Sequence, residues 1–354
     1  MPEPREKILV TGSSGLIGSA LVRSLAADFD LIGLDREGPP HPPREADWVF
    51  VDLTSDESVQ NAFTHVRLYH GPRIASVVHL AAYYDFSGAP SRKYEDVTIG
   101  GTERLLRELE RFEVGQFIFS STMLVHAPCR PGERIDETWP LQPKWAYPQS
   151  KLRTEELLER ERGAVPVAVL RIAGVYDDLC RSIPIARQIQ RICEGRLTGR
   201  LFPGDPSHGQ AFVHLDDAVD AIRRAVARRR ELGPFETLLV GESETVSYGD
   251  LQREIGRLLR GKEWSTWRVP RPLAKAAAWL QDRVADPFIK PWMIDLADDH
   301  YALDLRRARE RLVWEPRRSL RETLPRMIRA LREDPITWYR RNGLDLPRWL
   351  ARAG

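Results

Sequence analysis

The stretch Thr11-Gly12-Ser13-Ser14-Gly15-Leu16-Ile17-Gly18 lies between an apolar run at residues 7–10 and a helical pattern at residues 19–25. It predicts a short buried strand, a glycine-rich turn and the start of a helix. Glycines spaced as G-x-x-G-x-x-G let the chain turn tightly, approach a pyrophosphate closely and pack the helix against the strand. The helix N-terminus adds unpaired N–H groups and a positive dipole end. The predicted ligand of this turn is a dinucleotide.

An acidic residue follows at the distance that such a turn requires. A second strand is predicted at residues 29–35 and ends on Asp35, near the position, about 20 residues on, whose carboxylate binds the adenosine ribose hydroxyls. This carboxylate would repel a 2′-phosphate, so the sequence favours NAD over NADP. Arg36 comes next and can stack on adenine or pair with that phosphate, which leaves NADP as an alternative.

Strands alternate with helices through the first half of the chain. Further strands are predicted at residues 48–53, 76–82 and 116–119, with helical patterns at 54–70 and 102–112. This alternation predicts right-handed βαβ units and a parallel sheet covered on both faces. The predicted fold class is therefore α/β, a Rossmann-type doubly wound parallel sheet. His79 lies within an apolar strand, and we interpret it as a core histidine and not a catalyst.

Composition narrows the class of protein. The 354 residues carry 53 Lys and Arg against 51 Asp and Glu, a net charge of +2, so no global field favours nucleic acid. The three cysteines show no C-x-x-C spacing, and we predict neither disulfides nor a metal site. Residues 1–6 lack the apolar core of a signal peptide, and no run is long and apolar enough for a membrane span. These features predict a soluble cytoplasmic protein. Residues 228–230, all arginine, are interpreted as the solvated end of a helix rather than an anion site.

Polar side chains follow the strand predicted at 116–119. Ser120, Ser121 and Thr122 stand at the carboxyl end of a parallel strand, where active sites of such sheets lie; taken alone, they equally fit a cap or turn. Further on, Tyr147 and Lys151 head a helical pattern, and their spacing of four places both on one face.

A Tyr and a Lys at this spacing can perform acid–base chemistry. A phenol titrates near pH 10 in water, but a neighbouring ammonium and a positively charged nicotinamide ring both favour the phenolate. Tyr147 is therefore predicted as the catalytic base, with Lys151 supporting it and holding the nicotinamide ribose. Thr122, or alternatively Ser121, is predicted to donate a hydrogen bond to the substrate oxygen and stabilise an alkoxide-like transition state.

These motifs together resemble the extended short-chain dehydrogenase/reductase family, also called the NAD-dependent epimerase/dehydratase family. The resemblance runs from Lys7 to about Met327. In such enzymes the hydroxyl residue precedes the tyrosine by the distance that separates Thr122 from Tyr147, which points to Thr122. The resemblance also implies a homodimer formed through two helices. It places the cofactor against Gly12, Ser14, Gly15, Leu16, Ile17, Gly18, Asp35, Arg36, Asp52, Leu53, Leu80, Ala81, Ala82, Ser120, Tyr147 and Lys151.

The departures from the family pattern are informative. Dehydratases of the family carry Asp-Glu after the hydroxyl residue, whereas this chain has Met123-Leu124, which argues against a dehydratase. An arginine that binds a nucleotide-sugar diphosphate is missing from residues 207–212, and Thr98 replaces a usual Asn. Three other arginines are candidates to replace the missing one: Arg171, Arg181 and Arg200.

The later part of the chain looks more like the 3β-hydroxysteroid dehydrogenase branch. This resemblance rests on residues 268–285, 291–293 and 299–304. A helix predicted at 273–285 has an apolar face and a basic start, typical of an interfacial helix that receives a lipophilic substrate. The alternative is an amphipathic helix that covers the substrate domain or forms a dimer contact. Peripheral lipid contact is therefore left open.

The sequence predicts a dinucleotide-binding domain at residues 1–178, completed by about 211–241. A smaller substrate lobe takes 179–210 and 242–333, and 334–354 forms a helical tail. The predicted function is an NAD(P)-dependent oxidoreductase that transfers hydride to or from a small secondary alcohol or ketone. A sugar-nucleotide epimerase is the alternative, since it uses the same residues. A cofactor-binding sensor without catalysis is a third hypothesis, disfavoured by the Tyr-Lys pair.

Overall fold

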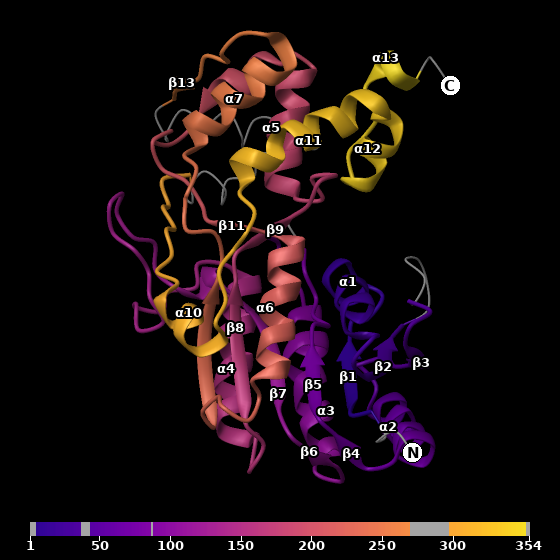
Figure 1. Cartoon of the computed structure of the whole chain (residues 1–354). Helices are drawn as coiled ribbons and strands as arrows, with labels where there is room; N and C mark the ends of the chain where they lie inside the picture. Colours follow the sequence, from indigo (N-terminus) through magenta and orange to yellow (C-terminus); the bar gives the residue numbers. More distant parts are fainter. Residues whose placement is uncertain (1–4, 37–42, 86–87, 270–296, 352–354) are drawn as a thin grey trace.

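The computed structural model describes residues 5–36, 43–85, 88–269 and 297–351 (Figure 1). Its centre is a seven-stranded parallel sheet in the order β12-β8-β7-β5-β1-β2-β3. The strands of this sheet are β1 Lys7–Thr11, β2 Asp30–Asp35, β3 Asp47–Phe50, β5 Ser76–His79, β7 Phe117–Thr122, β8 Val167–Ile172 and β12 Phe235–Val240. Three short parallel pairs join β4 (Arg73–Ile74) to β6 (Glu113–Val114), β9 (Gly174–Tyr176) to β11 (Phe212–His214), and β10 (Leu201–Phe202) to β13 (Trp267–Arg268).

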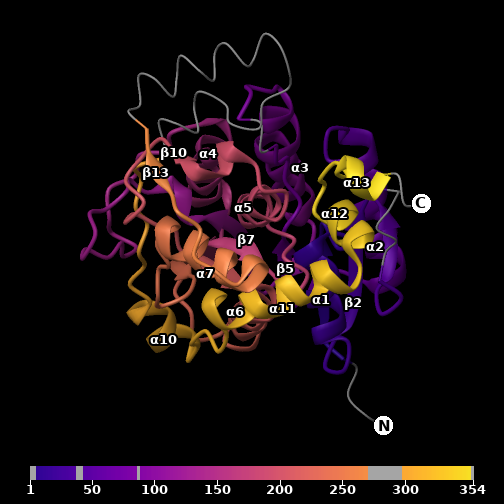
Figure 2. The same ribbon diagram turned by 90° about the horizontal axis from the view of Figure 1, so that it is seen from above.

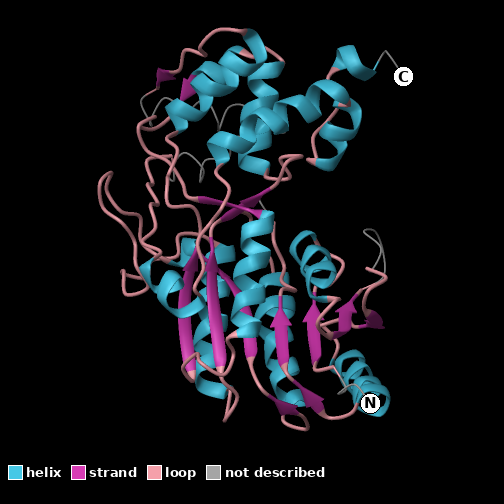
Figure 3. Ribbon diagram, viewed as in Figure 1, coloured by secondary structure: helices cyan, strands magenta, loops and turns pink. Residues whose placement is uncertain are grey.

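Helices cover both faces of the sheet (Figure 3). On β1, Ile8 and Val10 point to one face and Leu9 to the other, because side chains alternate along a strand. The face of Ile8 and Val10 packs against α1 (Leu16–Leu25), α6 (Leu215–Ala227) and α10 (Arg306–Leu312). The opposite face packs against α2 (Asp56–His70), α3 (Gly100–Leu109) and α4 (Ala146–Glu161). This arrangement confirms the predicted doubly wound parallel sheet.

A second group of helices lies beyond the carboxyl ends of the strands, as seen from the side in Figure 1 and from above in Figure 2. It consists of α5 (Ile183–Cys193), α7 (Tyr248–Arg260), α11 (Leu320–Glu333), α12 (Pro335–Arg341) and α13 (Arg348–Ala351). All five contribute to one buried apolar cluster. With the pair β10–β13 we call them the upper lobe. The chain crosses between the sheet and this lobe several times, so residues far apart in sequence meet where the two join.

Two parts of the chain bear on the predicted domain boundaries, which stay a prediction. Residues 306–312, assigned by those boundaries to the substrate lobe, form α10 and pack against β12 and α6. Ala308 and Leu312 of this helix are fully buried there. In the tail, Trp338 and Tyr339 of α12 are buried in the core of the upper lobe. Residues 306–312 therefore pack with the sheet, whereas Trp338 and Tyr339 pack with the upper lobe. Order along the chain alone does not give this division.

Some elements begin or end away from their predicted positions. The strand predicted at 76–82 ends at His79, because the N–H of Ala81 donates to the Thr11 side chain (3.2 Å) instead of continuing the ladder. The helix predicted at 102–112 begins earlier, since a π-helix, η1 (Tyr94–Ile99), leads into α3. Two 3₁₀ turns are also present, η2 (Met123–Val125) and η3 (Leu197–Arg200). The helix predicted at 273–285 lies outside the described residues. Within the described part of the chain, no helix has the length and apolarity needed to span a bilayer.

A buried carboxyl group joins the sheet to the upper lobe. Glu242 follows β12, accepts a hydrogen bond from the Tyr176 hydroxyl (2.6 Å) and another from the N–H of Leu320 at the start of α11 (2.9 Å). Burial raises the pKa of Glu242 to about 7. A raised carboxyl pKa favours the protonated form in the folded protein. The stabilising contribution of this group is therefore lost as the pH rises from about 4.5 through about 7.

We expect the substitution Glu242→Gln to flatten the pH dependence of stability. In the wild type, the urea concentration at the unfolding midpoint should decrease as the pH is raised from 5 to 8. The decrease should be smaller in Glu242→Gln, because that position no longer titrates. Glu244→Gln is the matched control, since Glu244 is exposed and pairs with Arg321 at the surface. Equal pH slopes for the wild type and Glu242→Gln would contradict this account.

Candidate active site

The glycine-rich turn is closed too tightly for side chains. A Cβ at Gly18 would lie 2.1 Å from the Gly12 carbonyl oxygen. At Gly12, which has φ +69°, a Cβ would lie 2.9 Å from the Ala81 backbone nitrogen. The turn thus presses against the end of β5. Gly15 precedes α1 and offers no side chain to cap it, so the first N–H groups of the helix have no side-chain acceptor at that position.

Acidic and hydroxyl groups surround the turn. The Asp35 carboxylate accepts hydrogen bonds from the N–H groups of Ser14 (2.8 Å) and Arg36 (2.8 Å), which holds it beside the turn. The Ser14 hydroxyl oxygen is buried without a hydrogen-bond partner among the described residues. A buried hydroxyl in this state calls for a ligand or water. With the uncapped helix, these groups fit a dinucleotide, and they are the residues that would hold it.

Asp52 and Leu53 have structural partners of their own. The Asp52 carboxylate accepts from the N–H (2.9 Å) and the hydroxyl (2.8 Å) of Thr54, and the hydrogen bond from that N–H is the main cause of its lowered pKa. Leu53 is buried against Gly101. Their predicted position beside the adenine stays a prediction.

A hydrogen-bond chain fixes the strand ends below the turn. The Thr102 hydroxyl donates to the Thr98 carbonyl (2.6 Å), so it accepts from His79 Nε2 (3.0 Å). His79 Nδ1 then accepts from the Thr11 hydroxyl (2.6 Å), whose oxygen accepts from the N–H of Ala81. Burial lowers the pKa of His79 to about 3, which keeps the imidazole neutral. The interpretation of His79 as a core histidine is confirmed.

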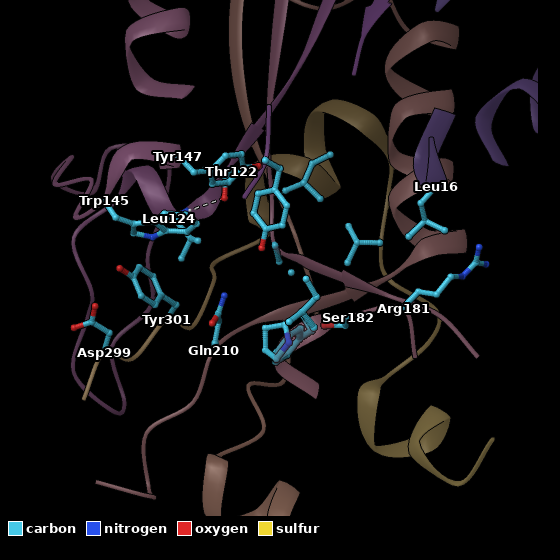
Figure 4. Close-up of a pocket in the computed structure, with 18 of the residues that line it drawn as sticks. Leu16, Thr122, Leu124, Trp145, Tyr147, Arg181, Ser182, Gln210, Asp299 and Tyr301 are labelled. Atoms are coloured by element: carbon cyan, nitrogen blue, oxygen red, sulfur yellow. Dashed lines mark hydrogen bonds between the residues drawn. The ribbon is translucent and has the colours of Figure 1, made fainter. Parts of the chain in front are cut away.

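One cavity of about 710 Å³ connects the turn with the upper lobe. Among the predicted site residues, those that line it are Gly12, Gly15, Leu16, Ile17, Gly18, Leu80, Ala82, Ser120, Thr122 and Tyr147, together with Ser121, the alternative to Thr122. The remaining predicted residues do not line it: Ser14, Asp35, Arg36, Asp52, Leu53, Ala81 and Lys151. Figure 4 shows Trp145, Tyr147, Thr122 and Leu124 gathered on one side of the cavity, with Leu16 and Arg181 on the other.

The predicted catalytic residues meet at the end of β7. Tyr147 lies in the first turn of α4, and Thr122 is the last residue of β7. Lys151, one turn after Tyr147, is buried. Its Nζ donates to the Ser120 carbonyl (2.7 Å) and lies 5.9 Å from the centre of the Tyr147 ring. The Thr122 hydroxyl accepts from the N–H of Leu124 (3.3 Å), which leaves its proton to donate to another group.

Burial governs the electrostatics of this pair. It raises the pKa of Tyr147 above the usual value for a phenol. It lowers the pKa of Lys151 to about 7, although the neighbouring Glu155 carboxylate opposes that shift. The predicted stabilisation of the phenolate is thus not achieved by the protein alone, since desolvation outweighs the nearby ammonium. Two positive charges can favour the phenolate once cofactor is bound: that of an oxidised nicotinamide ring and that of protonated Lys151.

Ser121 and Thr122 have different surroundings, because the Ser121 hydroxyl belongs to a buried polar network. The Ser121 hydroxyl donates to the Glu155 carboxylate, which also pairs with Arg171 (2.6 Å). The second guanidinium nitrogen of Arg171 donates to the Glu137 carbonyl (3.3 Å). Because the Ser121 proton is engaged there, the geometry favours Thr122 as the hydroxyl that meets substrate.

The three arginines proposed to replace the missing diphosphate ligand differ in position. Arg171 is buried in the network just described and does not line the cavity. Arg200 stacks on Trp264, 4.2 Å from the ring centre, also away from the cavity. Arg181 does line it; its Nε donates to Asp177 (2.6 Å), and with Cys180 it adopts positive φ (36° and 81°). Only Arg181 of the three therefore reaches the site.

Several lining residues were missed because they come from loops and from the upper lobe. They include Tyr84, Trp145, Gln188, Arg191, Phe202, Tyr248, Gln252 and Tyr301. One signal was available for Tyr84, which closely follows the strand at 76–79. Its ring packs edge-on against Tyr147, with the ring centres 4.8 Å apart. Thr98 also keeps a positioning role, since its hydroxyl accepts from the N–H of Tyr83 (3.1 Å).

A doubly wound sheet, a glycine-rich turn and a Tyr-Lys-Thr set at one cavity define a dinucleotide-dependent α/β enzyme. The model of the NAD dependent epimerase/dehydratase family matches residues 8–241. The chain belongs to this family, that of the extended short-chain dehydrogenase/reductases. This match confirms the predicted family and the predicted dependence on NAD.

The relatives include both dehydrogenase-type and epimerase proteins. Short-chain dehydrogenase/reductase family 42E member 1 of Bos taurus is 28% identical over 301 residues, 79% of this chain and 74% of that protein. A second relative is N-acetyl-alpha-D-glucosaminyl-diphospho-ditrans,octacis-undecaprenol 4-epimerase of Escherichia coli O157:H7. It is 27% identical over 281 residues, which cover 78% of this chain and 79% of that protein. The fold matches that of UDP-glucuronic acid 4-epimerase from Bacillus cereus, solved with UDP-glucuronic acid and NAD, with a TM-score of 0.70 at 20% identity, covering 92% of this chain and 99% of that one.

We expect Gly18→Ala to weaken NAD binding at least about tenfold, which corresponds to about 1.4 kcal/mol. The new Cβ cannot fit against the Gly12 carbonyl, so the turn must open and its N–H groups move. Titration of the protein with NAD, followed by tryptophan fluorescence, measures the change. Gly233→Ala is the control, because the nearest heavy atom that its Cβ would meet is a side-chain oxygen of Glu236 at 3.3 Å, and not backbone as at Gly18. Unchanged affinity in Gly18→Ala would rule out this turn as the phosphate site.

Proposed function

We propose that this protein is an NAD-dependent oxidoreductase that interconverts a secondary alcohol and a ketone. The observation that carries the proposal is the convergence of Tyr147 and Thr122 on the cavity that the glycine-rich turn also lines. Lys151 lies directly behind Tyr147. A binding protein without catalysis has no need for an acid–base group, its electrostatic partner and a hydroxyl donor at one point.

The chain's residues divide the chemistry between them. NAD, when bound, supplies the hydride acceptor, or the hydride in its reduced form. In the direction of oxidation, Tyr147 removes the hydroxyl proton of the substrate, and in reduction it returns a proton to the carbonyl oxygen. Protonated Lys151 lowers the free energy of the phenolate. Thr122 donates a hydrogen bond to the substrate oxygen, whose negative charge increases in the transition state.

Aromatic side chains pack around Tyr147. Tyr84 packs against Tyr147, and Trp145 lies 5.4 Å from Tyr147 between ring centres. Trp145 and Tyr84 are themselves 6.5 Å apart and line the cavity. A site of low polarity strengthens both the hydrogen bond from Thr122 and the attraction between Lys151 and the phenolate.

A sugar-nucleotide 4-epimerase is the second candidate. It is supported by the Escherichia coli relative and by the structural likeness to UDP-glucuronic acid 4-epimerase, proteins whose names state that activity. The same Tyr147, Lys151 and Thr122 would serve it, with hydride returned to the opposite face of the ketone. Net production of NADH therefore distinguishes the two candidates. The homodimer and the cytoplasmic location remain predictions from the sequence.

We expect Tyr147→Phe to bind NAD normally and to lose turnover by about 10²–10⁴-fold, the usual contribution of a positioned acid–base group. The substitution removes only the hydroxyl, so the ring contacts with Tyr84 and Trp145 persist. Turnover and NAD affinity are measured on the same preparation. Retained activity in this variant would contradict the assigned base.

We expect NADH to accumulate when the purified enzyme is given NAD in excess and lipophilic secondary alcohols such as hydroxysteroids. Its near-ultraviolet absorbance reports the reaction, and UDP- and dTDP-sugars form the comparison pool. If no NADH forms with either pool but chromatography shows a changed sugar configuration, the epimerase assignment replaces the oxidoreductase one.

A further inference from the structure

One face of α5 brings two polar side chains into the cavity at its upper-lobe end. Gln188 and Arg191 are three residues apart, so they lie on the same face of the helix, and both line the cavity. Gln188 is only 6% exposed, and its Oε1 has no hydrogen-bond partner among the described residues. A buried carbonyl oxygen without a partner is unfavourable unless a ligand or water satisfies it. The side chain therefore indicates a group with an O–H or N–H donor.

The charges along the cavity favour an anion. Among the described lining residues, three are cationic, Lys144, Arg181 and Arg191, and one is acidic, Asp299. Lys144 pairs with Asp299 (2.5 Å) and Arg181 with Asp177, and Arg191 too has interactions within the protein. Of the three cations, Arg191 is the one on the same helix face as Gln188.

Arg191 remains charged at this position. Its Nε donates to the Arg187 carbonyl (3.3 Å), which orients the guanidinium along the helix. Burial, together with the positive charges of Arg187 and Arg196, lowers its pKa to about 10, so the group is still cationic at neutral pH. A nearby oxyanion would relieve both the desolvation and the repulsion between these arginines.

An aromatic surface in the same cavity can hold the body of a substrate. Phe202 and Tyr248 face one another with ring centres 5.2 Å apart, and both line the cavity, as do Phe212 and Tyr301. The cavity thus offers an acid–base pair, an aromatic wall and a cationic helix face. These three surfaces match a substrate with a reacting alcohol, a flat or apolar body and a charged group.

We propose that Gln188 and Arg191 form the subsite for an oxyanion of the substrate, a phosphate, sulfate or carboxylate, with a hydroxyl or N–H donor beside it. The inference rests on the proposed function only in placing the reacting carbon at Tyr147. It adds a charged group to the substrate, so a charged ester of a lipophilic alcohol should bind more tightly than the neutral alcohol itself. The missing arginine at residues 207–212 is then replaced from α5.

The test compares probes that differ by one anionic group. The full-length Tyr147→Phe protein, saturated with NAD and lacking the proposed catalytic hydroxyl, is titrated calorimetrically with glucose 1-phosphate against glucose. A second pair is dehydroepiandrosterone sulfate against dehydroepiandrosterone. We expect the charged member of at least one pair to bind tenfold or more tightly than its neutral partner. The pair that shows this preference identifies the source of the oxyanion, a sugar phosphate or the ester of a lipophilic alcohol.

Substitutions on α5 then locate the preference. Arg191→Gln should reduce it below threefold, and Gln188→Leu should weaken the charged probe severalfold. Arg187→Gln is the matched control. It also removes one positive charge from α5, one helical turn from Arg191, but Arg187 does not line the cavity. Gln188→Glu keeps every arginine but sets a carboxylate beside Arg191, and it should abolish the preference even if Arg191→Gln fails to fold.

Three results would overturn the subsite: no preference for the charged member of either pair, a preference that survives both Arg191→Gln and Gln188→Glu, or an equal loss in Arg187→Gln. The binding readout does not depend on turnover. Failure of the proposed oxidoreductase function would appear instead as absence of NADH formation by the unsubstituted enzyme, with the binding preference intact.

Discussion

The contact between the glycine-rich turn and the end of β5 is the constraint on which the site depends. The Gly12 carbonyl approaches Gly18 so closely that no Cβ fits, and the same turn lies against the Ala81 backbone. This contact aligns the N-terminus of α1 with the carboxyl ends of β1 and β5, where helix N–H groups can meet phosphate oxygens. A turn opened by one methyl group would displace both the anion site and the strand ends.

Beneath that contact, a neutral histidine ties the strands to α3. His79 bridges Thr11 and Thr102, and Thr11 in turn receives the N–H of Ala81. Each polar group in this series of hydrogen bonds has a partner, which is what makes its burial tolerable. The result is a rigid floor to the cofactor side of the cavity.

Desolvation governs the pKa values of Tyr147 and Lys151, the pair that we propose to be catalytic. Burial moves the pKa of Tyr147 up and that of Lys151 down, so each neutral form is favoured in the protein alone. A positively charged nicotinamide ring reverses part of this balance, which couples the reactivity of Tyr147 to the presence of oxidised cofactor. The Glu155 carboxylate, held by Arg171 and Ser121, supports the charge on Lys151 from the opposite side.

The sequence by itself determined the class of fold, and it predicted as site features the glycine-rich turn, the acid at Asp35 and the set of Tyr147, Lys151 and Thr122. These features are local: strand and helix periodicity, glycine spacing and a four-residue interval all act within short stretches of chain. Only the tertiary structure decided that Ser121 is engaged by Glu155, that Arg171 is buried, and that Gln188 and Arg191 face the cavity. Those outcomes depend on which segments the crossings between sheet and lobe bring together, and side-chain packing between distant segments leaves no periodic signal in the sequence.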